Sequence, residues 1–214
     1  MQKIAAGCLG IFLLIFVIVV ITAIGSYNGL VKSSQAVDAQ WANVQTVYQR
    51  RADLIPNLVS TVAGAANFEK STLIAVTDAR ASVGQVKIDP NQAPSDPAQL
   101  AKYQAAQDQV HSALSRLLVV SENYPNLKTN ENFRDLQAQL ESTENRVNFA
   151  RSDFNTAVQT YNTKVKGFPT VLIAGIMGFS PKPYFEAAAG AENAPKINAS
   201  DFGGSTTPAP APAH

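Results

Sequence analysis

The sequence contains few of the residues with which most enzymes carry out chemistry. It has one cysteine and two histidines, and the second histidine is the last residue printed. It shows no cysteine cluster, H-E-x-x-H helix, E-x-x-H pair, P-loop or dinucleotide-type glycine loop, which are the signatures of zinc, di-iron and nucleotide sites. His111 lies on a helical pattern, where a surface or packing role is expected. We therefore expect no catalytic, cofactor-binding or metal-binding residues, and no enzyme.

An excess of charge is missing as well. There are 17 basic and 16 acidic residues, and Lys3 is one of the basic ones, so the chain after it is formally neutral. Binding to nucleic acid depends on clustered lysine and arginine, and no such cluster occurs. We expect no nucleic-acid partner. The alternating, β-branched pattern of strands is also missing, which favours an all-α fold.

A long uncharged run stands out against this background. Residues 4–24 are largely apolar, and 21 residues at about 1.5 Å each cover roughly 31 Å, close to the hydrocarbon core of a bilayer. A cleaved signal is the alternative, but it would have a shorter apolar region followed by a small-residue cleavage site. Cys8 lies near the start of the run, whereas a lipidation site should follow one. We predict a retained transmembrane helix after a short flank (residues 1–3).

The membrane orientation depends on a few charges. Lys3 and the amino terminus lie on the short side of the run, and Lys32 is the nearest charge on the other side. The positive-inside rule then favours a single-pass cell-membrane protein with its N-terminus in the cytoplasm and its bundle outside, periplasmic or extracellular.

Apolar residues spaced seven apart dominate the middle of the chain. Such stripes are the seams of helices packed almost parallel, as in bundles and coiled coils. They run through Leu30, Val37, Val44 and Leu58; through Tyr27, Trp41, Tyr48, Ile55 and Val62; through Leu100, Tyr103, Val110, Leu114 and Leu117; and through Phe133, Leu140, Val147, Phe154 and Tyr161.

Helix-capping residues and prolines divide this region into separate helices. A capping residue at Asp53 precedes Pro56, which suits a first turn, although a kinked continuous helix is the alternative. We predict helices over about 27–52, 54–86 and 130–166, with a third helix through 100–117 that ends at Tyr124 and Pro125. The fold class is then an N-terminal transmembrane helix followed by an antiparallel bundle of four long helices (residues 27–186). The Pro/Ala-rich residues 187–214 are expected to be disordered.

A second apolar segment, Thr170–Phe179, is too short to span a bilayer. We expect a short helix that caps the open end of the bundle, with an interfacial or partner-binding segment as the alternative. The candidate contact patch comprises Phe168, Pro169, Ile173, Ile176 and Phe179.

Polar residues also occupy the predicted seams. Arg51 lies on the same track as Leu30 and Leu58 and should point inward, where a charge must be paired. These residues form either a paired layer that fixes helix register or a groove for a ligand or partner segment. The candidate set is Arg51, Glu69, Arg80, Glu144, Asn148, Arg151, Asn155 and Asn162.

Several motifs resemble the LemA family of bacterial membrane proteins. They are residues 27–31 (YNGLV), Trp41, 49–59 (QRRADLIPNLV), 68–69, 78–80, 124–133 (YPNLKTNENF), 143–145, 150–151, 161–162, 168–169, 178–179 and 184–185. The resemblance covers about residues 25–186 and implies a single-pass, N-terminally anchored protein of long antiparallel helices. It implies no enzymatic activity. Some members are encoded near membrane proteases.

Taken with the missing catalytic motifs, these features predict a non-catalytic, membrane-anchored protein that acts through protein–protein contacts. Its expected partners are the lipid bilayer and other copies of itself, as a scaffold or oligomer at the bacterial envelope. The alternative is an accessory subunit that presents substrates to an envelope protease or another membrane protein of a quality-control system.

Overall fold

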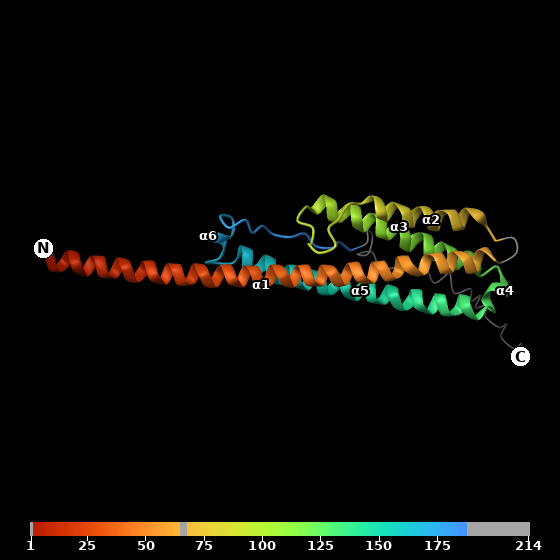
Figure 1. The fold of residues 1–214 in the computed structure, drawn as a ribbon, viewed down its shortest axis with the longest axis horizontal. Coiled ribbons are helices and arrows are strands. Elements are labelled where there is room, and N and C mark those ends of the chain that lie inside the picture. Colours follow the sequence, from red (N-terminus) through yellow and green to blue (C-terminus); the bar gives the residue numbers. More distant parts are fainter. Residues whose placement is uncertain (1, 65–67, 188–214) are drawn as a thin grey trace, which may run out of the picture.

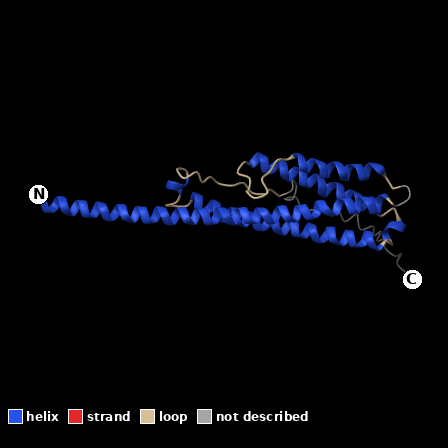
Figure 2. Cartoon of the chain, viewed as in Figure 1, coloured by secondary structure: helices blue, strands red, loops and turns tan. Residues whose placement is uncertain are grey.

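The computed structural model describes residues 2–64 and 68–187, and within them all regular structure is helical (Figures 1 and 2). The helices are α1 (Gln2–Ala63), α2 (Lys70–Gln85), α3 (Pro97–Ser121), α4 (Pro125–Lys128), α5 (Glu131–Lys166) and α6 (Val171–Ala174). The predicted all-α bundle is confirmed. From residue 188 onward, the tail predicted to be disordered lies outside the described residues.

α1 is a single helix of 62 residues, so the predicted break at Asp53 is wrong. Asp53 does not cap a helix; its carboxylate accepts a hydrogen bond from Gln49 Nε2 at 2.7 Å. Pro56 lies inside the helix and lacks the N–H that would bond to the carbonyl of Ala52. Arg80 of α2 donates its Nε to that carbonyl oxygen at 3.2 Å instead. The first bundle helix therefore continues to Ala63, and α2 is shorter than predicted.

The other long helices begin at conventional caps. Asp96 precedes Pro97, and its side chain accepts from Ala98 N at 2.9 Å. Asn130 accepts from Phe133 N at 3.2 Å and starts α5, which ends at Gly167. The predicted helix over about 130–166 agrees with α5.

The bundle consists of two antiparallel pairs. α5 lies along α1, while α2 and α3 pack against each other and cover one side of that pair (Figure 1). The apolar N-terminal part of α1 projects beyond the bundle and is long and apolar enough to cross a membrane. Its large apolar side chains from Leu9 to Ile21 are exposed.

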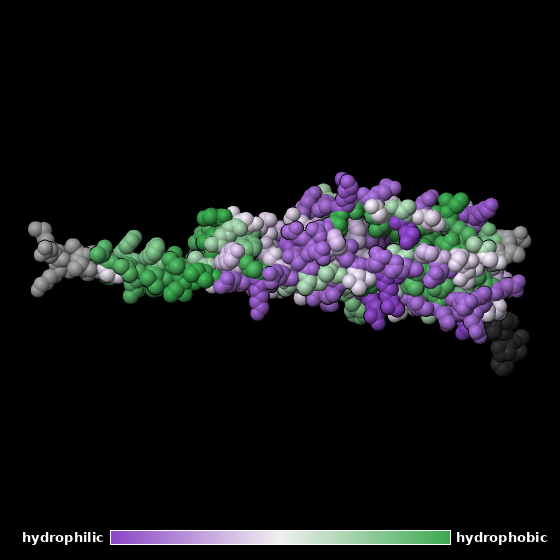
Figure 3. Space-filling model, in the orientation of Figure 1, coloured by the Kyte–Doolittle hydropathy of each residue, from purple (hydrophilic) through white to green (hydrophobic). Residues whose placement is uncertain are grey.

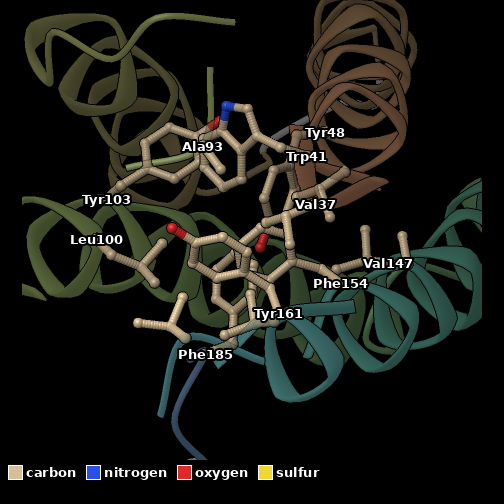
Figure 4. Close-up of a cluster of buried hydrophobic side chains, with 14 of the residues drawn as sticks. Val37, Trp41, Tyr48, Ala93, Leu100, Tyr103, Val147, Phe154, Tyr161 and Phe185 are labelled. Atoms are coloured by element: carbon tan, nitrogen blue, oxygen red, sulfur yellow. The ribbon is translucent and has the colours of Figure 1, made fainter. Parts of the chain in front are cut away.

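Two hydrophobic cores fill the bundle, one behind the other along its axis. The proximal core, nearer the projecting part of α1, is rich in aromatic side chains and includes Val37, Trp41, Tyr48, Tyr103, Val147, Phe154, Tyr161 and Phe185 (Figure 4). The distal core is mainly aliphatic and includes Ile55, Leu58, Val62, Val76, Leu114, Leu117, Phe133 and Leu140. The predicted seven-residue stripes contribute to both.

The predicted short helix after α5 is only one turn long. α6 spans Val171–Ala174, and the turns that follow are closed by Phe179 N, which donates to the Ala174 carbonyl at 2.9 Å. Gly178 adopts a φ of 77°, a conformation that favours glycine. Of this segment only Ala174 is fully buried, at 2% exposed. The segment lies where α1 leaves the bundle (Figure 1).

Candidate functional site

A polar layer separates the two cores at one level of the bundle. Arg51 of α1 is 2% exposed, as its position on the apolar track predicts. Its Nη1 lies 3.1 Å from Glu144 Oε2 of α5, and its Nη2 donates to the backbone and side-chain oxygens of Gln107 of α3. His111 Nδ1 lies 3.4 Å from the other oxygen of Glu144. Three helices are thus joined through one buried guanidinium.

A second arginine lies on the proximal side of this layer. Arg151 Nε donates to the Tyr48 hydroxyl at 2.6 Å, and its Nη2 donates to Asp108 Oδ1 at 3.0 Å. Burial raises the pKa of Tyr48 to about 12, although Arg151 and Arg51 oppose the shift. Tyr48 is therefore neutral at physiological pH and serves as a hydrogen-bond acceptor for Arg151.

Two predicted asparagines on α5 bind the extended segment that follows α6. Asn155 exchanges two hydrogen bonds with the backbone of Phe185, at 2.9 and 3.0 Å. Asn162 does the same with the backbone of Lys182, with both bonds at 2.8 Å. From α3, Gln104 makes a third such pair with Glu186. Each amide supplies the donor and acceptor that an extended backbone lacks outside a sheet.

The remaining members of the predicted set lie elsewhere. Glu69 is exposed at the start of α2 and accepts from Ser71 Oγ at 2.6 Å. Arg80 is exposed and bonds to the Ala52 carbonyl. Asn148 is exposed on α5. The structure therefore brings together Arg51 with Glu144, and Asn155 with Asn162 on one segment, but it does not gather all eight residues into one site.

Sequence reasoning missed several polar partners. Gln107 lies on the stripe of Leu100 and Val110, and the single polar residue in that stripe was a usable signal. Asp38 had no such signal: its Oδ1 accepts from Lys182 Nζ at 2.8 Å and from Ala93 N at 3.0 Å. Both partners lie in irregular segments whose paths no periodic pattern reveals.

A cleft of about 360 Å³ lies between α1, α2 and α3. Its lining includes Arg51, Arg80, Tyr48 and Tyr103, and no carboxylate, histidine or cysteine. Burial raises the pKa of Tyr103, as it does that of Tyr48, so neither phenol is an effective base near neutral pH. The cleft offers hydrogen-bond donors but no nucleophile paired with a base. Within the described residues no three histidine, cysteine or acidic side chains lie close enough to hold a metal ion.

The predicted contact patch lies at the proximal end of the bundle. Phe168 is 82% exposed and Ile176 is 86% exposed, and Pro169 is exposed as well. Ile173 and Phe179 are half-buried, and Phe179 packs its ring on Tyr27 of α1 at 5.8 Å between centroids. The patch thus touches α1 just beyond the apolar run.

Comparison with known proteins finds several related chains. Magnetosome protein MamQ 2 of Paramagnetospirillum magneticum is 28% identical over 182 residues, which cover 77% of this chain and 66% of the relative. Magnetosome protein MamQ of Magnetospirillum gryphiswaldense is 27% identical over 83% of this chain and 71% of its own length. Protein LemA of Metamycoplasma hominis is 21% identical over 84% and 74%, respectively. The matched part of the chain thus spans about two thirds of the length of the first of these relatives.

The family model of LemA matches residues 40–198. This range contains α2 to α6, α1 from Gln40 to Ala63, and every residue of the polar layer. The all-helical bundle and its apolar N-terminal helix agree with what the motif resemblance implies. On this match over most of its length, the chain belongs to the LemA family.

Proposed function

We propose that this protein is a membrane-tethered helical bundle that acts through protein–protein contacts, as a self-associating scaffold at the bacterial envelope. The observation that carries the proposal is that the buried charged groups and most other buried polar groups pair within the chain. Among the described side chains, Gln45 Nε2 and Thr72 Oγ1 are buried without a hydrogen-bond partner. The side chains that pair with other parts of the same bundle include Arg51, Arg151, Asn155 and Asn162. These groups support the register interpretation, and they leave the outer surface as the place where the protein meets others.

The continuity of α1 supports the tether. The same helix that forms the apolar run also enters both cores, so the bundle is attached to the membrane without a flexible linker. Anchored copies are confined to two dimensions, and weak lateral contacts gain from the high effective concentration. Scattered apolar side chains are available for such contacts: Phe149 is 72% exposed on α5, and Val119 is 67% exposed on α3.

The relatives support a non-enzymatic role in a limited way. Their names refer to a magnetosome and to the family itself, and none refers to a reaction. We extend this to the present chain as part of the proposal.

The test is the oligomeric state of the full chain. After detergent extraction, native mass measurement across a range of concentrations should detect dimers or larger species. A strictly monomeric protein at every concentration contradicts self-association. Co-purification of a membrane protease would instead favour the accessory-subunit alternative.

Crosslinking in intact membranes should locate the contact face. On a Cys8→Ser background, single cysteines at Phe149→Cys, Val119→Cys and Ile74→Cys sample three different helices, all at exposed positions. A specific interface crosslinks at one of these positions and not at the others. Equal crosslinking at all three indicates random collision.

The proposed orientation places the short N-terminus in the cytoplasm and the bundle outside. A topology reporter fused after Ala213 should be active only outside the cytoplasm. Activity only in the cytoplasm overturns this orientation.

A further inference from the structure

The segment that joins α5 to the extended C-terminal part is a long uncharged stretch of the bundle. No charged residue occurs from 167 to 181, between Lys166 and Lys182. We call residues 168–179 the apolar tip. Several of its large apolar side chains are exposed: Phe168 by 82%, Leu172 by 64% and Ile176 by 86%. In water such a group of exposed apolar side chains is unfavourable, and exposed apolar patches of this kind mark sites of contact with a membrane or another protein.

The apolar tip lies against α1 at the end of the apolar run. Phe179 packs on Tyr27, with ring centroids 5.8 Å apart. Met177 lines one apolar groove together with Val20, Ala23, Ile24 and Tyr27 of α1. In the space-filling view the hydrophobic surface of α1 continues onto the segment around α6 (Figure 3). The tip and the membrane-spanning part of α1 thus form one continuous apolar surface.

The length of α1 sets the level of this contact. Residues 4–31 contain no charge, and 28 residues at about 1.5 Å each extend about 42 Å, which is longer than the hydrocarbon core of roughly 30 Å. The hydrocarbon core accounts for residues 4–24, so residues 25–31 lie in the interfacial region. The tip contacts α1 between Val20 and Tyr27. It is therefore held at the boundary between acyl chains and headgroups.

The charges around the tip have one sign. Lys32 on α1 and Lys164 and Lys166 at the end of α5 are exposed. On α1 the carboxylate nearest the tip is that of Asp38, which is paired with Lys182. On α5 the nearest carboxylate is that of Asp153. Exposed lysines next to an apolar segment are the arrangement that binds anionic lipid headgroups.

We propose that the apolar tip inserts into the interface of the leaflet on the bundle side, with Phe168, Leu172 and Ile176 among the acyl chains and the neighbouring lysines at anionic headgroups. The bilayer covers the tip because α1 already holds it at that level. This second attachment goes beyond the protein-contact function and assigns the predicted contact patch to lipid. It also fixes the rotation of the bundle about α1 relative to the membrane surface.

The test measures the depth of a label on the tip. The full chain with Cys8→Ser and Ile176→Cys is spin-labelled and reconstituted in vesicles of phosphatidylcholine and phosphatidylglycerol at 3:1. Power saturation then compares the label's collisions with oxygen and with a water-soluble nickel complex. We expect oxygen accessibility to exceed nickel accessibility several-fold. The matched control is Val119→Cys, also exposed but at the distal end of the bundle, where nickel accessibility should exceed that of oxygen.

Leu172→Cys gives an independent reading from the same surface and should report a similar depth. Labels at both tip positions with the nickel accessibility of the Val119→Cys control overturn the proposal. A second copy of the chain could cover the tip instead of lipid. Spin–spin broadening at Ile176→Cys would then disappear on dilution with unlabelled protein, and water access to the label would rise. This result also overturns the proposal.

The lysine contribution is tested by lipid composition. In pure phosphatidylcholine the label at Ile176→Cys should lie nearer the surface than in the anionic mixture, and Lys164→Gln with Lys166→Gln should abolish the difference. A difference that persists in this variant contradicts the headgroup role of the lysines. The outcome is separable from self-association, because a strictly monomeric chain with a lipid-embedded tip contradicts the scaffold and supports the second attachment.

Discussion

The proximal and distal cores are built from the same helices but are stabilised differently. The distal core is mainly aliphatic, and it is enclosed largely by helices, whose backbone groups bond within the helix except at Pro56, where Arg80 pairs with the Ala52 carbonyl. The proximal core is rich in aromatic side chains, and irregular chain covers part of it. Trp41 Nε1 donates to the Asp89 carbonyl at 2.9 Å, and the Phe185 ring stacks on Trp41 and meets Phe154 edge to face. Extended backbone near the core needs external partners.

The side chains of Asn155, Asn162 and Gln104 provide those partners in the proximal half, whereas the distal half needs very few. The polar residues of α5 therefore lie where the neighbouring chain needs hydrogen-bond partners. Where the neighbour is a helix, α5 presents leucine and phenylalanine; where the neighbour is an extended segment, it presents asparagine.

The layer between the two cores should give the largest effect. Arg51→Ala leaves Glu144 and Gln107 without their buried partner, and the free energy of unfolding should fall by about 3–4 kcal/mol. Chemical denaturation of the full chain in detergent, followed by circular dichroism, measures this. Arg50→Ala is the matched control, because that arginine is exposed and adjacent. A stable Arg51→Ala protein that has lost a partner would favour the groove interpretation.

Alkaline pH should weaken the proximal core next. The pKa of Tyr48 is about 12 in the folded protein and 10.0 ordinarily, so its contribution is complete below pH 10 and is lost as the pH rises to about 12. The loss amounts to about 2–3 kcal/mol. Stability measured between pH 9 and 12 should decline less steeply in Tyr48→Phe. Some slope remains there, because burial also raises the pKa of Tyr103. Identical slopes in both proteins would contradict this assignment.

The asparagine pairs can be tested within one helix. Asn155→Ala removes two hydrogen bonds to the backbone of Phe185, and the free energy of unfolding should fall by about 2 kcal/mol, with faster hydrogen exchange over residues 180–187. Asn148→Ala, seven residues earlier and exposed, should change neither quantity. Equal effects of the two variants would contradict the claim that asparagine side chains stabilise the extended segment of the proximal half.

The smallest effect concerns the proline in the distal half. Arg80→Ala should lower stability by about 0.5–1 kcal/mol, because the Ala52 carbonyl loses its partner while the exposed site stays hydrated. In a Pro56→Ala background the helix can supply its own N–H, and Arg80→Ala should then have almost no effect. A double-mutant cycle measures the coupling, and simple additivity would contradict the pairing.

The periodic part of the fold was accessible from the sequence. Burial of Val37 and Phe154 follows from seven-residue spacing, because a helix repeats its contacts at that interval. The helix end at Asp53 was misread, since the carbonyl that Pro56 leaves unpaired is satisfied by Arg80, which is distant in sequence. The extended segment over 180–187 carried no periodic signal, so the partners of Asn155 could not be named.

The continuity of α1 makes the protein a lever as well as a tether. From Ile24 to Ala63 the helix rises about 58 Å, so the distal end of the bundle stands that far from the bilayer core. A tilt of about 10° in the membrane would move that end sideways by about 10 Å, with no joint to absorb it. Changes in bilayer thickness or in neighbouring membrane proteins that tilt α1 would therefore displace the distal surface of the bundle sideways.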